Sequence, residues 1–165
     1  MQEDYIIKPI FDQKADPDLW DNFVDVETSA RAQHGHMFMS TAYASILDSY
    51  YRAWKNFDNN IVFGAYKDGA LVGFADGYQT GAGYFYLDSL FVKPEFQGHG
   101  IGKNLLTEFE RAANLFGTNV CGISYPWSTG FYKHQSYNVR TNDKYNPSFT
   151  KKLKRPAAGI RAVFV

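Results

Sequence analysis

A glycine-rich stretch in the middle of this 165-residue chain carries its clearest chemical signal. Gly98, Gly100 and Gly102 alternate with larger residues, and apolar residues at helical spacing follow them. The first backbone N–H groups of a helix have no partners inside it, and the helix dipole adds partial positive charge there. Because glycine has no Cβ, an anion can approach such a backbone closely. The sequence therefore predicts an anion cradle, most naturally for a phosphate or pyrophosphate.

Two common phosphate-binding motifs fit this stretch poorly. A Walker loop requires GxxxxGK followed by Ser or Thr, but here the glycine spacing is one residue too short and Asn104 follows Lys103. A dinucleotide fingerprint requires GxGxxG, usually in a first βαβ unit, but here the spacing is GxGxG in mid-chain. A nucleotide-binding protein of either type is therefore disfavoured.

The six residues from Gln97 to Gly102, QGHGIG, match the pattern Q/R-x-x-G-x-G/A. This pattern is the acetyl-CoA signature of the GNAT-type N-acetyltransferases, and the preceding LFVKPEF is similar to that family's strand-to-loop lead-in. The resemblance implies acetyl-CoA as co-substrate, no metal, and acetyl transfer to a primary amine of a small molecule or peptide by direct attack in a ternary complex. The alternative is a non-catalytic module of the same fold that senses an acyl-CoA or a small amine.

The resemblance places the cofactor on the end of the central strand and on the glycine stretch. Backbone groups of the strand end would pair with the pantetheine arm, and one N–H would point at the thioester oxygen. Gln97 stands where the family often has Arg, so Lys93, His99 or Lys103 could supply the missing charge. The predicted cofactor-binding residues are Leu90, Phe91, Val92, Gln97, Gly98, His99, Gly100, Ile101, Gly102 and Lys103.

The same resemblance assigns the general acid. Residues 130–137 read GFYKHQSY and look like the family's FYxxxGF ending, which makes Tyr132 the donor to the departing thiolate. The sequence differs from the family pattern at two places where the cofactor is expected to make contacts near Tyr132. Ser136 replaces the family's Gly, and residues 125–127, YPW, replace a region that commonly holds an Asn.

The predicted general base is Asp88, which lies on the central strand close to the expected thioester. It could draw a proton from the amine directly or through water. Asp76 and Glu27 are the alternatives, and ordered water alone is a further one.

Other residues of reactive type receive no catalytic role. His34 and His36 resemble a metal-binding pair, but no third ligand stands out, so we interpret them as part of a substrate-side loop. Cys121 is expected to be a buried strand thiol, because no His or Asn pattern marks it as a nucleophile.

The remaining chain must supply the elements that position these groups. Asp16-Pro17 reads as a helix start, Ser40 as the cap of a second helix with an aromatic stripe, and Asp68-Gly69 as a hairpin turn. Strands are predicted over 5–10, 61–66, 70–79, 84–92, 118–123, 137–140 and 148–154, with later helices over 100–116 and 128–135. The order β-α-α-β-β-β-α-β-α-β-β predicts a mixed α/β sheet, and it resembles the GNAT fold over nearly the whole chain.

Within the central block, two pairings follow from this order. The three strands before the glycine stretch form an antiparallel meander, and the strand after the central helix runs parallel to 84–92 because its connection passes through a helix. Gly117 is expected to cap that helix, whose apolar face includes Phe116.

Composition predicts a single folded domain over residues 1–165. Basic and acidic residues balance at 17 each, so no nucleic-acid or membrane partner is expected. The single cysteine and the absence of a signal-peptide pattern predict a cytoplasmic protein. Residues 156–165 extend beyond the family core as a possible extra strand, and we expect that this apolar edge is covered in a homodimer.

Overall fold

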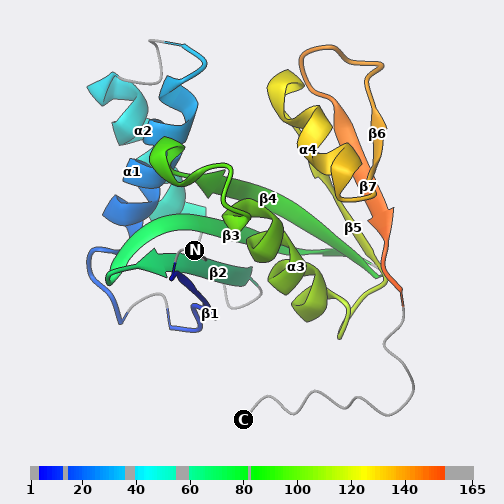
Figure 1. Cartoon of the computed structure of the whole chain (residues 1–165), viewed down its shortest axis with the longest axis horizontal. Helices are drawn as coiled ribbons and strands as arrows, with labels where there is room; N and C mark the ends of the chain where they lie inside the picture. The colour runs from blue at the N-terminus through cyan, green and yellow to red at the C-terminus, as the bar shows by residue number, and fades with distance from the viewer. Residues whose placement is uncertain (1–3, 13–14, 36–39, 55–59, 82, 155–165) are drawn as a thin grey trace.

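The protein is described by a computed structural model, over residues 4–12, 15–35, 40–54, 60–81 and 83–154 (Figure 1). The seven strands and four α-helices within these residues follow the predicted order. They are β1 (Ile6–Pro9), α1 (Leu19–Ala32), α2 (Thr41–Trp54), β2 (Asn60–Lys67), β3 (Ala70–Gly81), β4 (Tyr84–Val92), α3 (Ile101–Ala113), β5 (Asn119–Ile123), α4 (Thr129–His134), β6 (Asn138–Arg140) and β7 (Ser148–Lys152), with 3₁₀ turns η2 (Pro94–Phe96) and η3 (Pro126–Ser128).

One sheet in the order β1-β2-β3-β4-β5-β7-β6 organises the molecule. Strands β2, β3 and β4 form the predicted antiparallel meander, with its first turn at Asp68-Gly69. Strands β4 and β5 are parallel, as predicted, but they pair only from Tyr84 to Tyr86. Beyond Tyr86 they diverge, and Figure 1 shows β4 leading towards α1 and α2 while β5 leads towards α4. This divergence separates the sheet into two halves.

Helices cover the two faces of the sheet and create two hydrophobic clusters. On one face, Leu105 and Phe109 of α3 pack with Phe85 and Leu87 of β4. On the other face, α1 and α2 pack against β3, where the Phe23 ring stacks on Phe74 with centroids 4.0 Å apart. Burying a large apolar side chain of this kind contributes about 1.5–3 kcal/mol, so both clusters anchor the end of β4 firmly.

A β-bulge interrupts β4 at Asp88. Asp76 of β3 pairs with Ser89 and Gly77 pairs with Leu87, which leaves Asp88 without a register partner. The extra residue reverses the alternation of β4, so that Leu87 packs in the α3 cluster while Phe91 packs in the α1–α2 cluster. Bulges re-aim side chains beside active sites, and here the re-aimed residue is the predicted base.

Two predicted helix boundaries are wrong. The cap residue of α1 is Asp18 rather than Asp16, because the Asp16 carboxylate accepts the Asp18 N–H at 3.0 Å and holds a turn before the helix. Helix α3 ends at Ala113, so Phe116 lies beyond it and is 68% exposed. The C-cap residue is Asn114 rather than Gly117, although the Gly117 N–H donates to the Ala113 carbonyl at 2.9 Å. A Cβ on Gly117 would lie 2.8 Å from the Gly83 carbonyl oxygen, so this position requires glycine for close packing.

The predicted cap of α2 is confirmed, because Ser40 Oγ accepts the Tyr43 N–H at 3.1 Å. Residues 156–165 lie outside the described residues, so the extra strand and the dimer stay predictions. None of the described helices is both long and apolar enough to span a membrane.

Candidate active site

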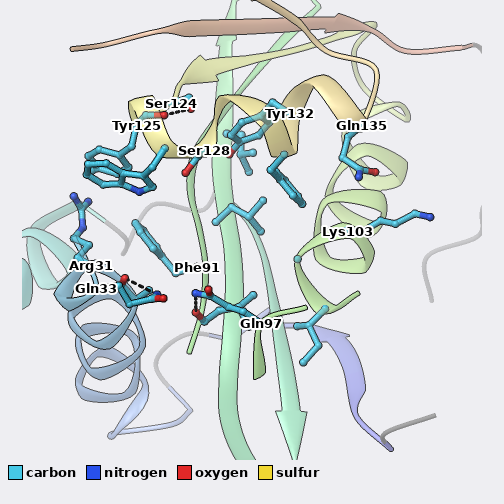
Figure 2. A pocket seen from close by; sticks show the side chains of 18 of the residues that line it. Arg31, Gln33, Phe91, Gln97, Lys103, Ser124, Tyr125, Ser128, Tyr132 and Gln135 are labelled. Atoms are coloured by element: carbon cyan, nitrogen blue, oxygen red, sulfur yellow. Dashed lines mark hydrogen bonds between the residues drawn. The ribbon is translucent and has the colours of Figure 1, made fainter. Parts of the chain in front are cut away.

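A pocket of about 650 Å³ lies where β4 and β5 diverge. Its lining comes from both halves of the sheet: the ends of α1 and β4, the turn before α3, the first turn of α3, and the segment from β5 to α4. In Figure 2, Lys103 and Arg31 lie at opposite ends of the view, with Tyr132 between them. The pocket is therefore elongated between two cationic ends.

The glycine stretch forms one end of the pocket. Gly98 and Gly100 have φ angles of 80° and 84°, which side chains with a Cβ rarely adopt. A Cβ on Gly98 would meet nothing within 4 Å, and one on Gly100 only the Tyr5 hydroxyl at 3.9 Å. The space that these side chains leave open is available to a ligand. Gly102 differs, because a Cβ there would contact Phe131 at 3.6 Å.

The first turn of α3 directs backbone N–H groups into this end. The first hydrogen bond of the helix runs from the Asn104 N–H to the Gly100 carbonyl at 3.0 Å, and no side chain among the described residues caps the helix. The N–H groups of Ile101, Gly102 and Lys103 precede that bond, and all three residues line the pocket. Together with the helix dipole, this arrangement fits a pyrophosphate.

The structure separates the three suggested sources of positive charge. Lys103 is exposed and lines the pocket. Lys93 forms an ion pair with Asp25 at 2.6 Å, and neither residue lines the pocket. His99 lies outside the described lining, with Nδ1 3.2 Å from the Phe96 carbonyl oxygen. Lys103 is thus the cation placed to face an anion at the glycine end.

The Gln97 side chain has a structural role in the same turn. Its Nε2 donates to the Val92 carbonyl at 2.8 Å, which ties the turn to the end of β4 (Figure 2). The GNAT-type family that the sequence resembles often has Arg at this position, and Arg would add a positive charge. Gln97 is neutral and contributes this hydrogen bond instead.

The end of β4 presents an open edge to the pocket. Leu90, Phe91 and Val92 pair with β3 on one side, while β5 pairs with β4 only as far as Tyr86 on the other. All three residues line the pocket. An open strand edge carries N–H and C=O groups that an amide-containing chain can bond, as the pantetheine prediction requires.

Tyr132 lies on α4 in an aromatic cluster beside the pocket. Its ring stacks on Phe149 with centroids 3.9 Å apart and meets Tyr137 edge-on at 5.6 Å. Burial raises the pKa of Tyr132 above its ordinary value of 10.0, so the phenol is protonated at neutral pH. Tyr132 is 7% exposed and lines the pocket, and within the described part of the chain its hydroxyl forms no hydrogen bond. The hydroxyl therefore fits a proton donor.

A hydrogen-bonded clasp holds α4 in place. The Tyr137 hydroxyl donates to Glu110 of α3 at 2.8 Å, and Lys151 of β7 bonds the same carboxylate at 2.9 Å and the Gln135 carbonyl at 3.0 Å. Ser136, which replaces the family's Gly, has a φ of 66°. The backbone keeps the left-handed conformation that Gly favours, so the clasp forms despite the substitution.

Of the three predicted carboxylates, only Asp88 lines the pocket. The Tyr50 hydroxyl donates a hydrogen bond to it from α2. Burial, and then this bond, raise the pKa of Tyr50, so it remains a donor. Glu27 is 3% exposed and accepts the Tyr51 hydroxyl at 2.6 Å, and Asp76 is 0% exposed. Asp88 is therefore the carboxylate placed to meet a ligand.

The other end of the pocket, which we call the stacked wall, consists of Arg31, His34, Tyr125 and Trp127. Sequence reasoning assigned His34 to a substrate-side loop and singled out the YPW segment at 125–127, but it missed Arg31 and the stacking of these side chains. The His34 and Trp127 rings stack with centroids 4.1 Å apart, Trp127 and Tyr125 stack at 4.6 Å, and the Arg31 guanidinium lies 4.6 Å from the Tyr125 ring. These contacts join α1 to η3 across the divergent strands. For Arg31 the sequence signal was its spacing from Glu27, which indicates an ion pair and no pocket.

The remaining reactive side chains are placed as follows. His34 belongs to the stacked wall, whereas His36 lies outside the described residues. No three His, Cys, Asp or Glu side chains in the described ranges gather as a metal site would require. Cys121 lies on β5 and is half-buried rather than buried, and this burial raises the pKa of its thiol.

Comparison with known proteins gives one family match. The model of the acetyltransferase (GNAT) family matches residues 27–137, which include β4, the glycine stretch and Tyr132. No curated protein matches the chain.

Solved structures with the same architecture are numerous at low sequence identity. PaiA N-acetyltransferase from Thermoplasma acidophilum, solved with coenzyme A, is 20% identical, with a TM-score of 0.68 over 89% of this chain and 99% of its own. An acetyltransferase from Thermus thermophilus is 15% identical, with a TM-score of 0.72 over 93% and 100%. An aminoglycoside 6'-N-acetyltransferase complexed with coenzyme A is 18% identical, with a TM-score of 0.66 over 92% and 99%. These similarities show the fold.

Proposed function

We propose, from the premise that this chain belongs to the acetyltransferase (GNAT) family, that it moves an acetyl group from acetyl-CoA to a primary amine of a small molecule or peptide. The observation that carries the proposal is one pocket whose lining includes an anion cradle, a carboxylate and a phenol. The cradle is the glycine stretch, and the two proton-transfer groups are Asp88 and Tyr132.

Acetyl-CoA supplies an activated acetyl group on a thioester. The N–H groups of residues 101–103 and the Lys103 ammonium bind its pyrophosphate, and the open edge of β4 from Leu90 to Val92 bonds the pantetheine arm. One N–H of this edge stabilises the charge that develops on the thioester oxygen. Much of the acceleration comes from holding both reactants in one orientation.

Asp88 and Tyr132 carry out the two proton transfers of the reaction. Asp88 accepts one proton from the bound ammonium group, so that the nitrogen lone pair can form the new C–N bond. The nitrogen loses its second proton to solvent as the tetrahedral intermediate collapses to the amide. As the C–S bond breaks, the Tyr132 phenol gives its proton to the sulfur and is reprotonated from solvent. Starting from an ammonium group, the products are an amide, a CoA thiol and one proton released to solvent.

The test is Tyr132→Phe, which keeps the ring that stacks on Phe149 and deletes only the donor. We expect kcat to fall about 10²- to 10⁴-fold, the scale of general acid catalysis, with little change in acetyl-CoA affinity. Because the pKa of Tyr132 is raised above 10.0, the phenol keeps its proton as the pH rises to that value and can still donate it. Weaker acetyl-CoA binding with normal kcat would instead make Tyr132 a binding residue.

The matched control is Tyr145→Phe, which removes a hydroxyl from an exposed tyrosine outside the pocket and should leave kcat unchanged. Release of free CoA thiol with a panel of amines separates an enzyme from a non-catalytic module of the same fold. A protein that binds acetyl-CoA and releases no thiol with any amine would contradict the proposed function.

A further inference from the structure

Tyr5 reaches the glycine end of the pocket from β1, which lies at one edge of the sheet (Figure 1). It directly precedes Ile6, the first residue of β1 that pairs with β2. Because strand side chains alternate between faces, Tyr5 and Ile7 share a face, and both are partly buried against the hydrophobic cluster of α3. This packing carries the Tyr5 ring to the first turn of α3, where Asn104 Nδ2 donates a hydrogen bond to its hydroxyl oxygen.

The Tyr5 hydroxyl borders the space that Gly100 leaves open. A Cβ on Gly100 would lie 3.9 Å from the hydroxyl oxygen, and it would meet no other atom of the described residues within 4 Å apart from its chain neighbours. Gly100 lines the pocket, and the residues that follow it, 101–103, supply the N–H groups of the anion cradle. A side-chain hydroxyl therefore stands next to the anion cradle.

The hydrogen bonding of Tyr5 leaves its own proton to be donated. A phenol hydroxyl donates one hydrogen bond and accepts others through its oxygen. The bond from Asn104 uses an oxygen lone pair, because an amide nitrogen is a donor only. Within the described part of the chain, Tyr5 forms no other hydrogen bond. An anion in the cradle can therefore accept the O–H of Tyr5.

Charge decides on which side of Tyr5 a phosphate is favoured. A smaller hollow of about 470 Å³ lies beside this residue, and its charged lining residues are Asp4, Glu108 and Arg111. Glu108 forms an ion pair with Arg111 at 2.8 Å, so Asp4 adds negative charge to this hollow. The cradle instead offers backbone N–H groups and the Lys103 ammonium. A phosphate is therefore favoured at the glycine end of the pocket.

We infer that Tyr5 is a further cofactor-binding residue, whose hydroxyl donates a hydrogen bond to the pyrophosphate of CoA at the glycine stretch. This inference rests on the proposed function and adds a residue from outside the strand–turn–helix unit. It also bears on a sequence difference, because Gln97 stands where the family often has Arg and its amide is engaged with the Val92 carbonyl. A donor from β1 offsets part of the anion binding that a neutral residue at this position lacks.

Tyr5→Phe tests the inference, because it keeps the ring that packs against the α3 cluster and deletes only the hydroxyl. Titration calorimetry with CoA should give a Kd about 10- to 100-fold higher than that of the wild type, the scale of one hydrogen bond to a charged group. Dephospho-CoA keeps the pyrophosphate but lacks the 3'-phosphate, and its affinity should fall by the same factor. A CoA Kd within about 3-fold of the wild type would overturn the inference, as would a loss seen with CoA but not with dephospho-CoA.

Asn104→Ala is the matched control, because it deletes the same internal hydrogen bond and keeps the Tyr5 hydroxyl. Asn104 lies within α3, where Ala favours the helix, so the first turn should stay intact. We expect its CoA Kd to rise less than about 3-fold. Thermal unfolding checks that both variants are folded. If Asn104→Ala weakens CoA binding as much as Tyr5→Phe does, Tyr5 braces the helix instead of binding phosphate, and the inference fails.

Binding and turnover measurements keep the two proposals apart. If Tyr5→Phe weakens CoA binding as expected but no amine releases CoA thiol, Tyr5 binds the cofactor and the proposed acetyl transfer fails. If thiol is released and Tyr5→Phe binds CoA as tightly as the wild type, the acetyl transfer stands and the role of Tyr5 fails. A wild-type protein that does not bind CoA would overturn both. If both hold, Tyr5→Phe should raise the KM for acetyl-CoA and leave kcat at saturation unchanged.

Discussion

The two ends of the pocket are built in different ways. The glycine end is formed by consecutive residues of one strand–turn–helix unit, from Leu90 to Lys103. The stacked wall is assembled from the end of α1 with His34 just beyond it, and from Tyr125 with η3, two segments that are far apart in the chain and touch across diverging strands. The glycine end offers mainly backbone N–H groups, whereas the stacked wall offers side chains.

This difference in construction separates a general anion-binding end from an end that selects among acceptors. Backbone groups at a helix start bind any pyrophosphate, because their geometry depends on φ and ψ rather than on side-chain identity. A wall of rings and one guanidinium depends on every residue in it, and its charges select among acceptors. We therefore expect changes at the glycine end to affect cofactor binding, and changes at the stacked wall to affect acceptor choice.

The largest expected effect is at the glycine end. Gly100→Val places a branched side chain at a φ of 84° and in the space proposed for the pyrophosphate. We expect acetyl-CoA to bind at least about 10³-fold more weakly, since several charge-assisted hydrogen bonds are lost. Titration calorimetry measures the affinity.

Gly69→Val is the matched control for backbone strain. Gly69 has a φ of 80° and open space around it, but it lies in the β2–β3 hairpin outside the pocket. Both variants should lose similar stability, and only Gly100→Val should lose affinity. If the two folded variants bind acetyl-CoA with equal affinity, the pyrophosphate does not bind at the glycine stretch.

The next effect tests Asp88, the predicted general base. Asp88→Asn keeps an acceptor for the Tyr50 hydroxyl but removes the base, so we expect kcat to fall about 10²-fold with acetyl-CoA affinity unchanged. Steady-state kinetics measure it, with the exposed Asp21→Asn as control. A larger loss in Asp76→Asn, without loss of fold, would transfer the role of base to that buried carboxylate.

A smaller effect is expected at the stacked wall. Trp127 is 45% exposed and stacks on both His34 and Tyr125, so Trp127→Ala removes the centre of the wall at little cost in stability. We expect the acceptor KM to rise about 10-fold, because an interfacial aromatic contributes about 1–2 kcal/mol. Acetyl-CoA affinity should change less than about 3-fold on the same scale. If affinity for acetyl-CoA falls instead, the two ends are not separate in function.

The smallest effect concerns stability alone. Ser136 has a φ of 66°, in the left-handed region where a side chain costs about 1–2 kcal/mol. Ser136→Gly should stabilise the fold by about 0.5–1 kcal/mol, after the larger chain entropy of Gly is subtracted. Thermal unfolding measures the change, and kcat should stay the same. A destabilised Ser136→Gly would show that the serine side chain contributes to the clasp around α4.

Most of the fold could be predicted because its signals are local. The hairpin at Asp68-Gly69, the Ser40 cap and the periodicity of α3 each arise within a few residues, and each appears in the structure. The predicted helix boundaries are wrong where another local interaction competes with helix formation. The Asp16 side chain held a turn before α1, and the chain left the helix after Ala113 to bring Gly117 against Gly83.

The glycine end of the pocket could be predicted from the sequence, because the residues that line it are neighbours in the chain and its backbone conformation follows from glycine. The other end depends on how distant segments pack. The bulge at Asp88 depends on pairing with β3, and the choice of Asp88 over Glu27 depends on which carboxylate the helices bury. Arg31 meets Tyr125 only because β4 and β5 diverge and carry α1 and η3 to one place. Contacts across such distances follow from packing, which no local pattern encodes.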